Sequence, residues 1–260
     1  MTTNLSVNLN KVALLRNARV GDTPDIEHAA RLVLDAGAAG ITVHPRPDMR
    51  HVRPDDVFRL AELIAKDYPD REFNIEGNPK AGTDSSSYPG YMEIIKEIRP
   101  TQATLVPDSD EQLTSDHGWD LPRQAGEIRE HVGRLKDWGV RVSLFMDVGA
   151  HQDIAAASAA GADRIEVYTG PFAAAHHEGA QALKSALEAY VCISKAAETA
   201  GLGINAGHDL SLDNLTRLVS AFPPLEVSIG HALTAEALQY GLPETVRRYL
   251  QILNSPRCNK

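Results

Sequence analysis

The chain has 260 residues, 43% of them hydrophobic and 23% charged, which is an ordinary composition for a folded protein of one or two domains. Its formal net charge of -9 disfavours nucleic acid and anionic membranes as partners, because both are bound by basic surfaces. Local clusters of basic residues can still bind small anions.

Short apolar segments typical of buried strands alternate with segments of helical spacing along the whole chain. The helical segments at 26–38 and 153–162 are examples, and several of them end on an Ala-Gly pair, which suits the left-handed residue that closes many helices. Nearly continuous apolar strands separated by helices indicate a parallel sheet with both faces covered. The predicted strands lie at residues 5–9, 40–44, 72–76, 102–107, 141–147, 163–170, 203–207 and 225–230.

Eight strand-helix units in one chain of this length predict a closed (β/α)8 barrel of the α/β class, the TIM barrel, with extra helices. We expect a single barrel domain over residues 1–260, because no low-complexity linker divides the chain. An open, doubly wound parallel sheet is the alternative arrangement of the same units. The segment 77–90 is rich in turn-forming residues and is predicted to be a long loop after the third strand.

Polar and titratable residues follow the predicted strands, at the end of the barrel where active sites lie. Glu166 lies inside an apolar strand, where an isolated carboxylate is costly unless it is paired or serves a site. Four of the ten histidines fall at strand ends, which predicts one ring of titratable groups built by several strands. The residues at these positions are Asn8, Asn10 and Lys11 (first strand), His44, Arg46 and His51 (second), Glu76 (third), Glu166 (sixth), His208 (seventh), and Gly230 and His231 (eighth).

Glycines beside the last two strands indicate where an anion would bind. Strands seven and eight of such barrels commonly frame a phosphate site, and glycine lets backbone N–H groups approach an anion. The stretch from Asn205 to His208 and the pair Gly230-His231 have this character. Any single polar residue at a strand end can instead be a cap or a solvated loop residue, and Arg16 and Arg50 are expected to be solvated or to pair with carboxylates.

Motifs for cofactors are absent from the sequence. It contains no HExxH or cysteine–histidine ligand pair, no glycine-rich dinucleotide fingerprint and no Walker motif, which predicts that neither a metal nor a nucleotide is needed. Lys11 is the only lysine placed at a strand end, so an aldolase that forms a Schiff base there is one alternative. A barrel that only senses a sugar phosphate is another, but a sensor has no use for Glu76 and three histidines beside arginines.

The cysteines and the N-terminal segment bear on location. Cys192 and Cys258 lack metal-ligand spacing and do not suggest a disulfide framework, which fits a reducing compartment. No signal peptide is visible at the N-terminus, and no apolar run is long enough to span a membrane. We therefore expect a cytoplasmic protein that acts on small molecules, without nucleic-acid or membrane partners.

A series of segments extends in order from the first strand to the last helix: VNLNKVALLRNAR, GITVHPRPDMRH, FNIE, ATLVPD followed by Thr114, VSLFMD, IEVYTG, NAGHDL and IGHAL. Taken together, they resemble the pyridoxine 5'-phosphate synthase family over nearly the whole chain. The resemblance implies a (β/α)8 barrel that assembles as a homo-octamer built from dimers. It also implies a transferase of vitamin B6 biosynthesis that joins 1-deoxy-D-xylulose 5-phosphate to 3-amino-2-oxopropyl phosphate, closing the pyridine ring and releasing phosphate and water.

The resemblance also implies a role for each matching residue. The catalytic set would be His44 and Glu76 as general acid/base residues, His208 as proton donor and Glu166 as stabiliser of the transition state. The aminoketone supplies the amine of the imine, so no enzyme lysine is required, and arginine and histidine suit the two phosphates. By the same resemblance, the aminoketone phosphate would contact Asn8, Arg19, Gly230 and His231, and the deoxyxylulose phosphate would contact Arg46, His51 and Thr114.

The sequence departs from the family pattern at three places. Asn10 and Lys11 stand where many members have Asp-His beside the sugar phosphate, and we expect them to bind it with altered detail. Asp209 replaces the glycine that usually follows the catalytic histidine near the aminoketone phosphate. A carboxylate there would repel phosphate unless it turns away. The stretch from Gly77 to Tyr88 is longer than in the commonest members.

Overall fold

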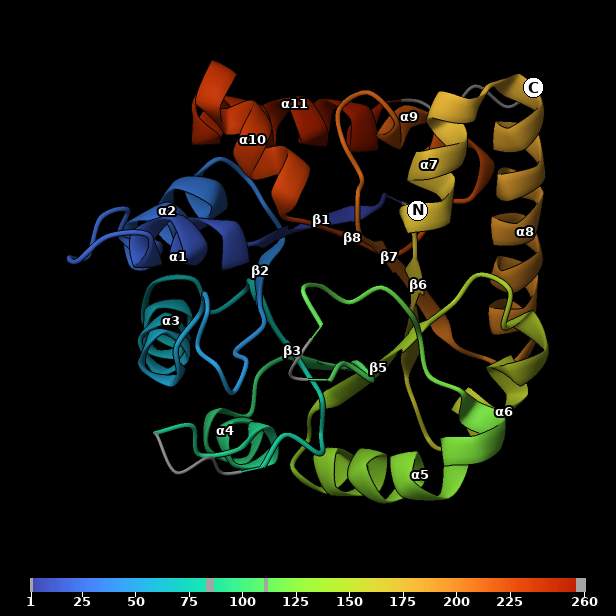
Figure 1. Cartoon of the computed structure of the whole chain (residues 1–260), viewed down its shortest axis with the longest axis horizontal. Helices are drawn as coiled ribbons and strands as arrows, with labels where there is room; N and C mark the ends of the chain where they lie inside the picture. Colours follow the sequence, from blue (N-terminus) through green and yellow to red (C-terminus); the bar gives the residue numbers. More distant parts are fainter. Residues whose placement is uncertain (1, 83–86, 110–111, 256–260) are drawn as a thin grey trace.

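Eight parallel strands form one closed barrel, in which each strand pairs with the next along the chain and the last pairs with the first (Figure 1). The computed structural model describes residues 2–82, 87–109 and 112–255. The strands are β1 (Asn4–Asn8), β2 (Gly40–Val43), β3 (Glu72–Gly77), β4 (Gln102–Leu105), β5 (Arg141–Met146), β6 (Arg164–Tyr168), β7 (Gly203–Gly207) and β8 (Glu226–Ile229). The predicted (β/α)8 barrel is confirmed, and closure between β8 and β1 excludes the open sheet.

Helices surround the barrel, with at least one after each strand (Figure 1). The helices that lead from one strand to the next are α2 (Ile26–Asp35), α3 (Pro54–Asp67), α4 (Tyr91–Ile98), α5 (Leu121–Asp137), α6 (Ile154–Ala159), α8 (Ala180–Thr199), α9 (Leu215–Ala221) and α11 (Leu242–Asn254). The expected extra helices are α1 (Asn10–Asn17), α7 (Gly170–Glu178) and α10 (His231–Tyr240). Each of them begins two residues after a strand ends, so its first turn lies at the mouth of the barrel.

The Ala-Gly pairs end helices as predicted. Gly37, Gly161 and Gly201 follow α2, α6 and α8 with φ angles of 109°, 91° and 72°. A side chain is strained at such angles, which explains why glycine closes these helices. The sixth strand is shorter than predicted and ends at Tyr168, because Pro171 in the first turn of α7 favours the start of a helix.

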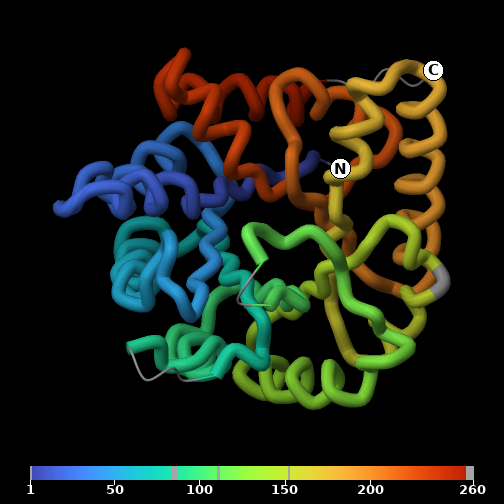
Figure 2. Tube along the Cα trace, viewed as in Figure 1, coloured from blue at the N-terminus to red at the C-terminus, as the bar shows by residue number. Residues whose placement is uncertain are grey.

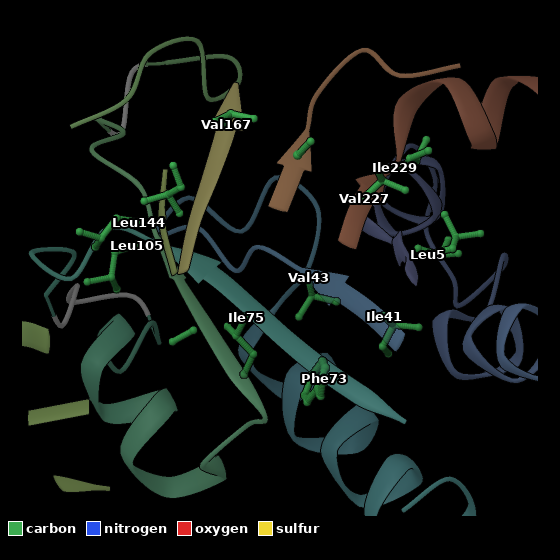
Figure 3. Packing of buried hydrophobic residues seen from close by; sticks show 14 of the residues in the cluster. Leu5, Ile41, Val43, Phe73, Ile75, Leu105, Leu144, Val167, Val227 and Ile229 are labelled. Carbon is green, nitrogen blue, oxygen red and sulfur yellow. The ribbon is translucent and has the colours of Figure 1, made fainter. Parts of the chain in front are cut away.

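The two faces of each strand differ in chemistry. Side chains that face the helices are apolar and buried, as Ile41, Val43 and Ile75 show in Figure 3. The alternate side chains face the barrel axis and are polar, as at Ser6 and Thr42, yet they are also buried. The prediction of a parallel sheet with both faces covered is confirmed, and the polar positions of the strands are enclosed by the barrel.

Polar side chains inside the barrel hydrogen-bond to one another. The hydroxyl oxygens of Ser6 and Thr42 lie 2.7 Å apart, and Asn74 Nδ2 donates to Thr42 Oγ1 at 3.3 Å. Thr104 Oγ1 in turn donates to Asn74 Oδ1 at 3.0 Å. Buried polar groups require such partners, so this ring allows polar residues to continue along the barrel axis up to its mouth.

The first and last parts of the chain lie together on one side of the barrel. Leu5 of β1 is in register with Val227 of β8, and α2 packs beside α11. The blue and red parts of the tube therefore run side by side (Figure 2). Closing the barrel thus joins segments more than two hundred residues apart in the sequence.

Two observations bear on the surroundings of the protein. Cys192 is exposed and has no disulfide partner, whereas Cys258 lies outside the described residues. Among the residues that the structure describes, no helix combines the length and the apolar character needed to cross a membrane.

A buried ion pair fixes α1 against α3. Arg16 donates to both carboxylate oxygens of Asp56, at 2.6 and 2.8 Å, and both side chains are buried. Arg16 also donates to the backbone carbonyl of His51 at 3.3 Å, and Asn17 Nδ2 donates to the same carbonyl at 2.8 Å. The expectation that Arg16 pairs with a carboxylate is confirmed, and the pair holds α1 and the loop after β2 in one arrangement.

We expect Asp56→Asn to lower the free energy of unfolding by about 3–5 kcal/mol, because the Arg16 guanidinium then stays buried without a counter-charge. The matched control is Asp67→Asn, which breaks the more exposed 2.7 Å pair with Arg31 and should cost about 0.2–1 kcal/mol. Urea unfolding followed by circular dichroism measures both values. Equal losses in the two variants would contradict a special role for the buried pair.

Candidate active site

A cavity of about 370 Å³ lies at the C-terminal ends of the strands. Each strand, or the loop that follows it, contributes to the wall of this cavity. All the residues predicted for the site line it, with the exception of Arg19. The lining residues are Asn8, Asn10, Lys11, Leu14, His44, Arg46, Arg50, His51, Glu76, Val106, Leu113, Thr114, Ser115, Phe145, Glu166, His208, Asp209, Ser228, Gly230 and His231.

Glu76 and His44 belong to a hydrogen-bonded group built on β1, β2 and β3. Asn8 Nδ2 donates to Glu76 Oε2 at 3.3 Å, and the same oxygen lies 3.9 Å from His44 Nδ1. Asn10 Oδ1 accepts from the backbone N–H of His44 at 2.9 Å, and the Asn10 N–H donates to Asn8 Oδ1 at 3.0 Å. The Asn10 side chain therefore positions His44, a task for which either an amide or a carboxylate supplies the required oxygen.

Burial moves the pKa values of Glu76 and His44 in opposite directions. Burial, reinforced by the charge of Asp108, raises the pKa of Glu76 to about 8. Burial, reinforced by the charge of Arg46, lowers the pKa of His44 well below its usual range. At neutral pH Glu76 holds a proton, the reverse of its behaviour in water, and the imidazole of His44 stays neutral. The site thus places a carboxylic acid that can give a proton beside an imidazole that can take one.

Glu166 of β6 is a buried carboxyl group in the same cavity. Burial, followed by the charges of Glu76 and Glu226, raises the pKa of Glu166 well above its usual range. Its Oε2 atom is buried and has no hydrogen-bond partner among the described residues. A Cβ atom at Gly207 would lie 2.2 Å from Glu166 Oε1, so the position of this carboxyl requires glycine there. No charge from a cation of the described residues lowers this pKa, so burial and the neighbouring carboxyl groups favour the protonated form of Glu166.

The loop after β2 supplies basic groups to the cavity. Arg46 is buried and forms an ion pair with Asp108. His51 Nδ1 accepts from the next backbone N–H at 2.9 Å, which places the proton of the neutral ring on Nε2. Burial, Arg46 and Lys11 lower the pKa of His51 to about 3. His51 can therefore donate one neutral hydrogen bond, while Arg46 and Lys11 supply positive charge.

His208 lies across the cavity, directly after β7. Its Nε2 atom is 2.9 Å from Thr114 Oγ1, and its Nδ1 atom is 3.0 Å from Asp209 Oδ2. Thr114 belongs to the loop after β4, so this contact spans the mouth of the barrel. On the neighbouring strand, a Cβ atom at Gly230 would lie 3.0 Å from Asn8, which shows how closely the ends of β8 and β1 approach.

Proteins of similar sequence identify the family. The family model for "Pyridoxal phosphate biosynthesis protein PdxJ" matches residues 5–255. The chain belongs to the PdxJ family. A relative named pyridoxine 5'-phosphate synthase, from Xanthomonas campestris pv. campestris (strain B100), is 53% identical over 97% of both chains. A relative of the same name from Xylella fastidiosa (strain M23) is 52% identical over 97% of this chain and 95% of its own. The resemblance is confirmed, and the chain is an enzyme of pyridoxine biosynthesis.

Solved structures share the barrel at low sequence identity. TrpF from Jonesia denitrificans has a TM-score of 0.59 and 15% identity, covering 99% of this chain and 100% of its own. The tryptophan synthase A-subunit from Pyrococcus furiosus has a TM-score of 0.60 and 10% identity, covering 97% of both chains. At these identities the comparison shows that this chain shares the barrel fold with them, and nothing further.

One residue of the PdxJ pattern is not brought to the cavity. Arg19 is exposed beyond the end of α1 and lines a separate surface depression together with Arg53. Its contact with the aminoketone phosphate stays a prediction. Arg50 Nε donates to Asp48 Oδ2 at 2.5 Å, so the expectation that Arg50 is solvated or pairs with a carboxylate is confirmed. Arg50 also lines the cavity.

Sequence reasoning missed the contributions of Asp108, Ser115 and Tyr168. Asp108 Oδ2 accepts from Ser115 at 2.7 Å as well as from Arg46, while its Oδ1 is buried without a partner among the described residues. Asp108 follows the fourth strand closely, so the rule that found the other strand-end residues also points to it. The Tyr168 and His208 rings meet edge-on, with their centroids 5.1 Å apart. The sequence gives no signal for this contact, because an aromatic residue in a strand usually indicates the hydrophobic core.

The described part of the chain contains no group of three or more histidine, cysteine, aspartate and glutamate residues placed to hold a metal ion. The adjacent His176 and His177 lie on α7, outside the cavity of the PdxJ site. His176 Nε2 instead lies 3.1 Å from Asp213 Oδ2. The contact between His176 and Asp213 therefore lies outside the cavity.

Glu76→Gln tests the raised pKa of Glu76 without any substrate. Between about pH 4.5 and 8 the folded protein keeps a proton on Glu76 that the unfolded chain releases, so this carboxyl makes the parent less stable as pH rises. The stability of the variant relative to the parent should therefore increase by up to about 1.4 kcal/mol per pH unit across this range. Urea unfolding at several pH values measures the difference. A difference that does not change with pH would show that Glu76 titrates as it does in water.

Proposed function

We propose that the chain is a pyridoxine 5'-phosphate synthase, a single barrel domain that condenses 1-deoxy-D-xylulose 5-phosphate with 3-amino-2-oxopropyl phosphate by general acid/base catalysis. The observation that carries the proposal is the convergence of Glu76, His44 and Arg46 in one cavity. An acid and a base with opposite pKa shifts stand there beside groups suited to phosphate. Membership of the PdxJ family supports the same reaction, and we propose that no metal or nucleotide takes part.

Protonated Glu76 and neutral His44 suit the first steps of this condensation. The amine of the aminoketone attacks the ketone of the sugar phosphate, and the hydroxyl formed on that carbon must leave as water. Glu76 gives the proton that completes the water, because burial keeps the carboxyl neutral. His44, 3.9 Å away, accepts the proton lost from carbon when the imine becomes an enamine. After these steps His44 holds a proton that it can give, and the Glu76 carboxylate can accept one, so both groups can act again in later steps.

The later steps use the opposite side of the cavity. Loss of phosphate, addition of water and ring closure each develop charge on oxygen, and we assign His208, which lines the cavity beside Thr114, as the proton donor. Glu166, whose Oε2 is buried without a partner among the described residues, can accept a hydrogen bond when deprotonated or donate one when protonated. We assign it to the stabilisation of the transition state.

The two phosphates are assigned to different parts of the rim. Arg46, His51, Thr114 and the Asn10-Lys11 pair suit the deoxyxylulose phosphate. Asn8, Gly230 and His231 suit the aminoketone phosphate, because α10 begins at His231 and its first backbone N–H groups point toward an anion bound at the mouth. Arg19 is assigned to this second phosphate on the family pattern alone.

We further propose a cytoplasmic enzyme that assembles as a homo-octamer built from dimers. The free Cys192 fits a reducing compartment. Exposed apolar side chains on and near α1 and α10 supply a surface suited to contact between copies: Leu14, Leu15, Val20, Leu238 and Tyr240. Light scattering coupled to size-exclusion chromatography measures the mass of the assembly and tests this number of subunits.

The function is tested by mixing the purified protein with both substrates and following pyridoxine 5'-phosphate. We expect product to form, and to form equally after exhaustive chelation. Glu76→Gln should keep both substrates bound but lower kcat by about 10²–10⁴-fold, because an amide cannot exchange protons. A variant with near-normal kcat would remove Glu76 from the mechanism, and loss of product after chelation would contradict a metal-free reaction.

Lys11→Met should raise KM for deoxyxylulose phosphate by about tenfold to a hundredfold, the effect of losing a charge-assisted hydrogen bond of about 1.5–3 kcal/mol. KM for the aminoketone should not change, because its phosphate is assigned to β8 and α10. The alternative aldolase predicts something else: kcat collapses in the variant, and borohydride traps a substrate on Lys11 in the parent. A solvated lysine without a role predicts no change in kcat or in either KM.

A further inference from the structure

The dipeptide His208-Asp209 after β7 has an unusual backbone. Its two φ angles are 90° and 55°, in the left-handed region that most residues with a side chain avoid. Asparagine and aspartate adopt this region more readily than other such residues. Conformations of this kind persist only where the surroundings impose them, and they collect at functional sites.

Two buried side chains impose this conformation. The hydroxyl of Thr169, between β6 and α7, lies within hydrogen-bond distance of the backbone carbonyls of Gly207, at 2.7 Å, and of His208. Asn214 Nδ2 donates to the backbone carbonyl of Asp209 at 2.9 Å. Three successive carbonyl groups are therefore held from within the protein, and the direction of the Asp209 side chain follows from them.

That direction brings the Asp209 carboxylate onto the ring of its neighbour. Asp209 Oδ2 lies 3.0 Å from His208 Nδ1, and Thr114 Oγ1 lies 2.9 Å from His208 Nε2. The edge of the ring also packs against Tyr168, with centroids 5.1 Å apart. The imidazole is thus held on three sides, with Nδ1 against Asp209 and Nε2 against Thr114, a residue that lines the same cavity.

We propose that Asp209 is a positioning residue that acts on the reaction through His208. Its carboxylate accepts a hydrogen bond from Nδ1–H, which fixes the ring and keeps Nε2 beside Thr114 at the cavity wall, where a substrate oxygen can take the place of the threonine hydroxyl. In this step His208 starts as an imidazolium with a proton on each ring nitrogen. It gives the Nε2 proton to a substrate oxygen, the electron pair of the N–H bond stays on Nε2, and the neutral ring keeps its hydrogen bond from Nδ1–H to Asp209. This role rests on the proposed function and explains why a carboxylate can replace glycine beside a phosphate site.

The charges around Asp209 agree with this arrangement. The hydrogen bond from His208 lowers the pKa of Asp209, and the charges of His231 and Lys11 lower it further against the opposing effect of burial. The group is therefore an ionised carboxylate in a cavity expected to bind two phosphates. Asp209 lines the cavity, so an unpaired carboxylate there would repel phosphate, whereas pairing with the His208 ring at 3.0 Å offsets its charge.

The experiment compares kcat and both KM values in the parent, Asp209→Gly, Asp209→Asn and a matched control. Glycine and asparagine both accept a left-handed backbone, so both variants keep the fold. Asp209→Gly should lower kcat by about tenfold to a hundredfold, part of the 10²–10⁴-fold that a general acid contributes, and leave both KM values unchanged. Asp209→Asn keeps an oxygen for Nδ1–H and should retain more of kcat than Asp209→Gly. The control, Asp213→Asn, removes an exposed carboxylate that contacts His176 outside the cavity, and should match the parent.

The outcomes separate the two levels of the proposal. A parent that forms no pyridoxine 5'-phosphate overturns the proposed function and the role of Asp209 with it. An active parent whose Asp209→Gly variant keeps full kcat overturns only the positioning role. A fall in KM for the aminoketone at unchanged kcat also overturns it, because the carboxylate would then act on phosphate binding and not on His208.

Discussion

The enclosure of polar side chains by an apolar outer layer is the constraint on which the structure of this barrel depends. Residues such as Ile41 and Val43 face the helices, so every alternate residue must face the barrel axis. There the Thr42 and Thr104 hydroxyls and the Asn74 amide hydrogen-bond to one another. The polar groups along the axis are therefore buried and still have hydrogen-bond partners. Carboxyl groups along this axis are buried, and burial disfavours their charged form and so raises their pKa values.

Burial affects carboxyl groups along the barrel axis, from Glu226 at the start of β8 to Glu76 and Glu166 at the mouth. Burial, reinforced by Glu72, raises the pKa of Glu226 to about 7, although Arg164 and Arg141 oppose the shift. The charge of Glu226 then adds to the burial that raises the pKa values of Glu166 and Glu76. The perturbed groups of the site are therefore a property of the whole barrel interior, and not of the cavity alone.

The fold and most of the site could be predicted from the sequence because both depend on local order along the chain. Glycines such as Gly37 end helices through their own backbone freedom, and the end of each strand marks the mouth of the barrel. Reading the residues at those ends was enough to find His44, Glu76 and His208, which the structure brings into one cavity. The sequence does not reveal that the polar residues of the strands hydrogen-bond to one another along the barrel axis, because these contacts join different strands.

What could not be predicted depends on contacts between distant segments. The partner of Arg46 is Asp108, and the partner of Arg16 is Asp56, but no spacing in the sequence specifies either pair. The position of Arg19 depends on where the chain turns after α1, and the structure places it outside the cavity. These pairs form because the closed barrel brings distant segments together. The sequence pattern predicts the order of strands and helices but not the side-chain contacts between them.

The assignment of acid and base does not depend on the ion pair that lies beside them. Asp108 raises the pKa of Glu76 and Arg46 lowers it, so the two members of one ion pair act in opposition on this carboxyl. Burial is the largest cause of the shift at Glu76 and also at His44. A phosphate bound by Arg46 would change the smaller, opposing contributions but would exclude still more water from both groups. Molecules that fill the cavity would therefore strengthen the burial that keeps Glu76 protonated and His44 neutral.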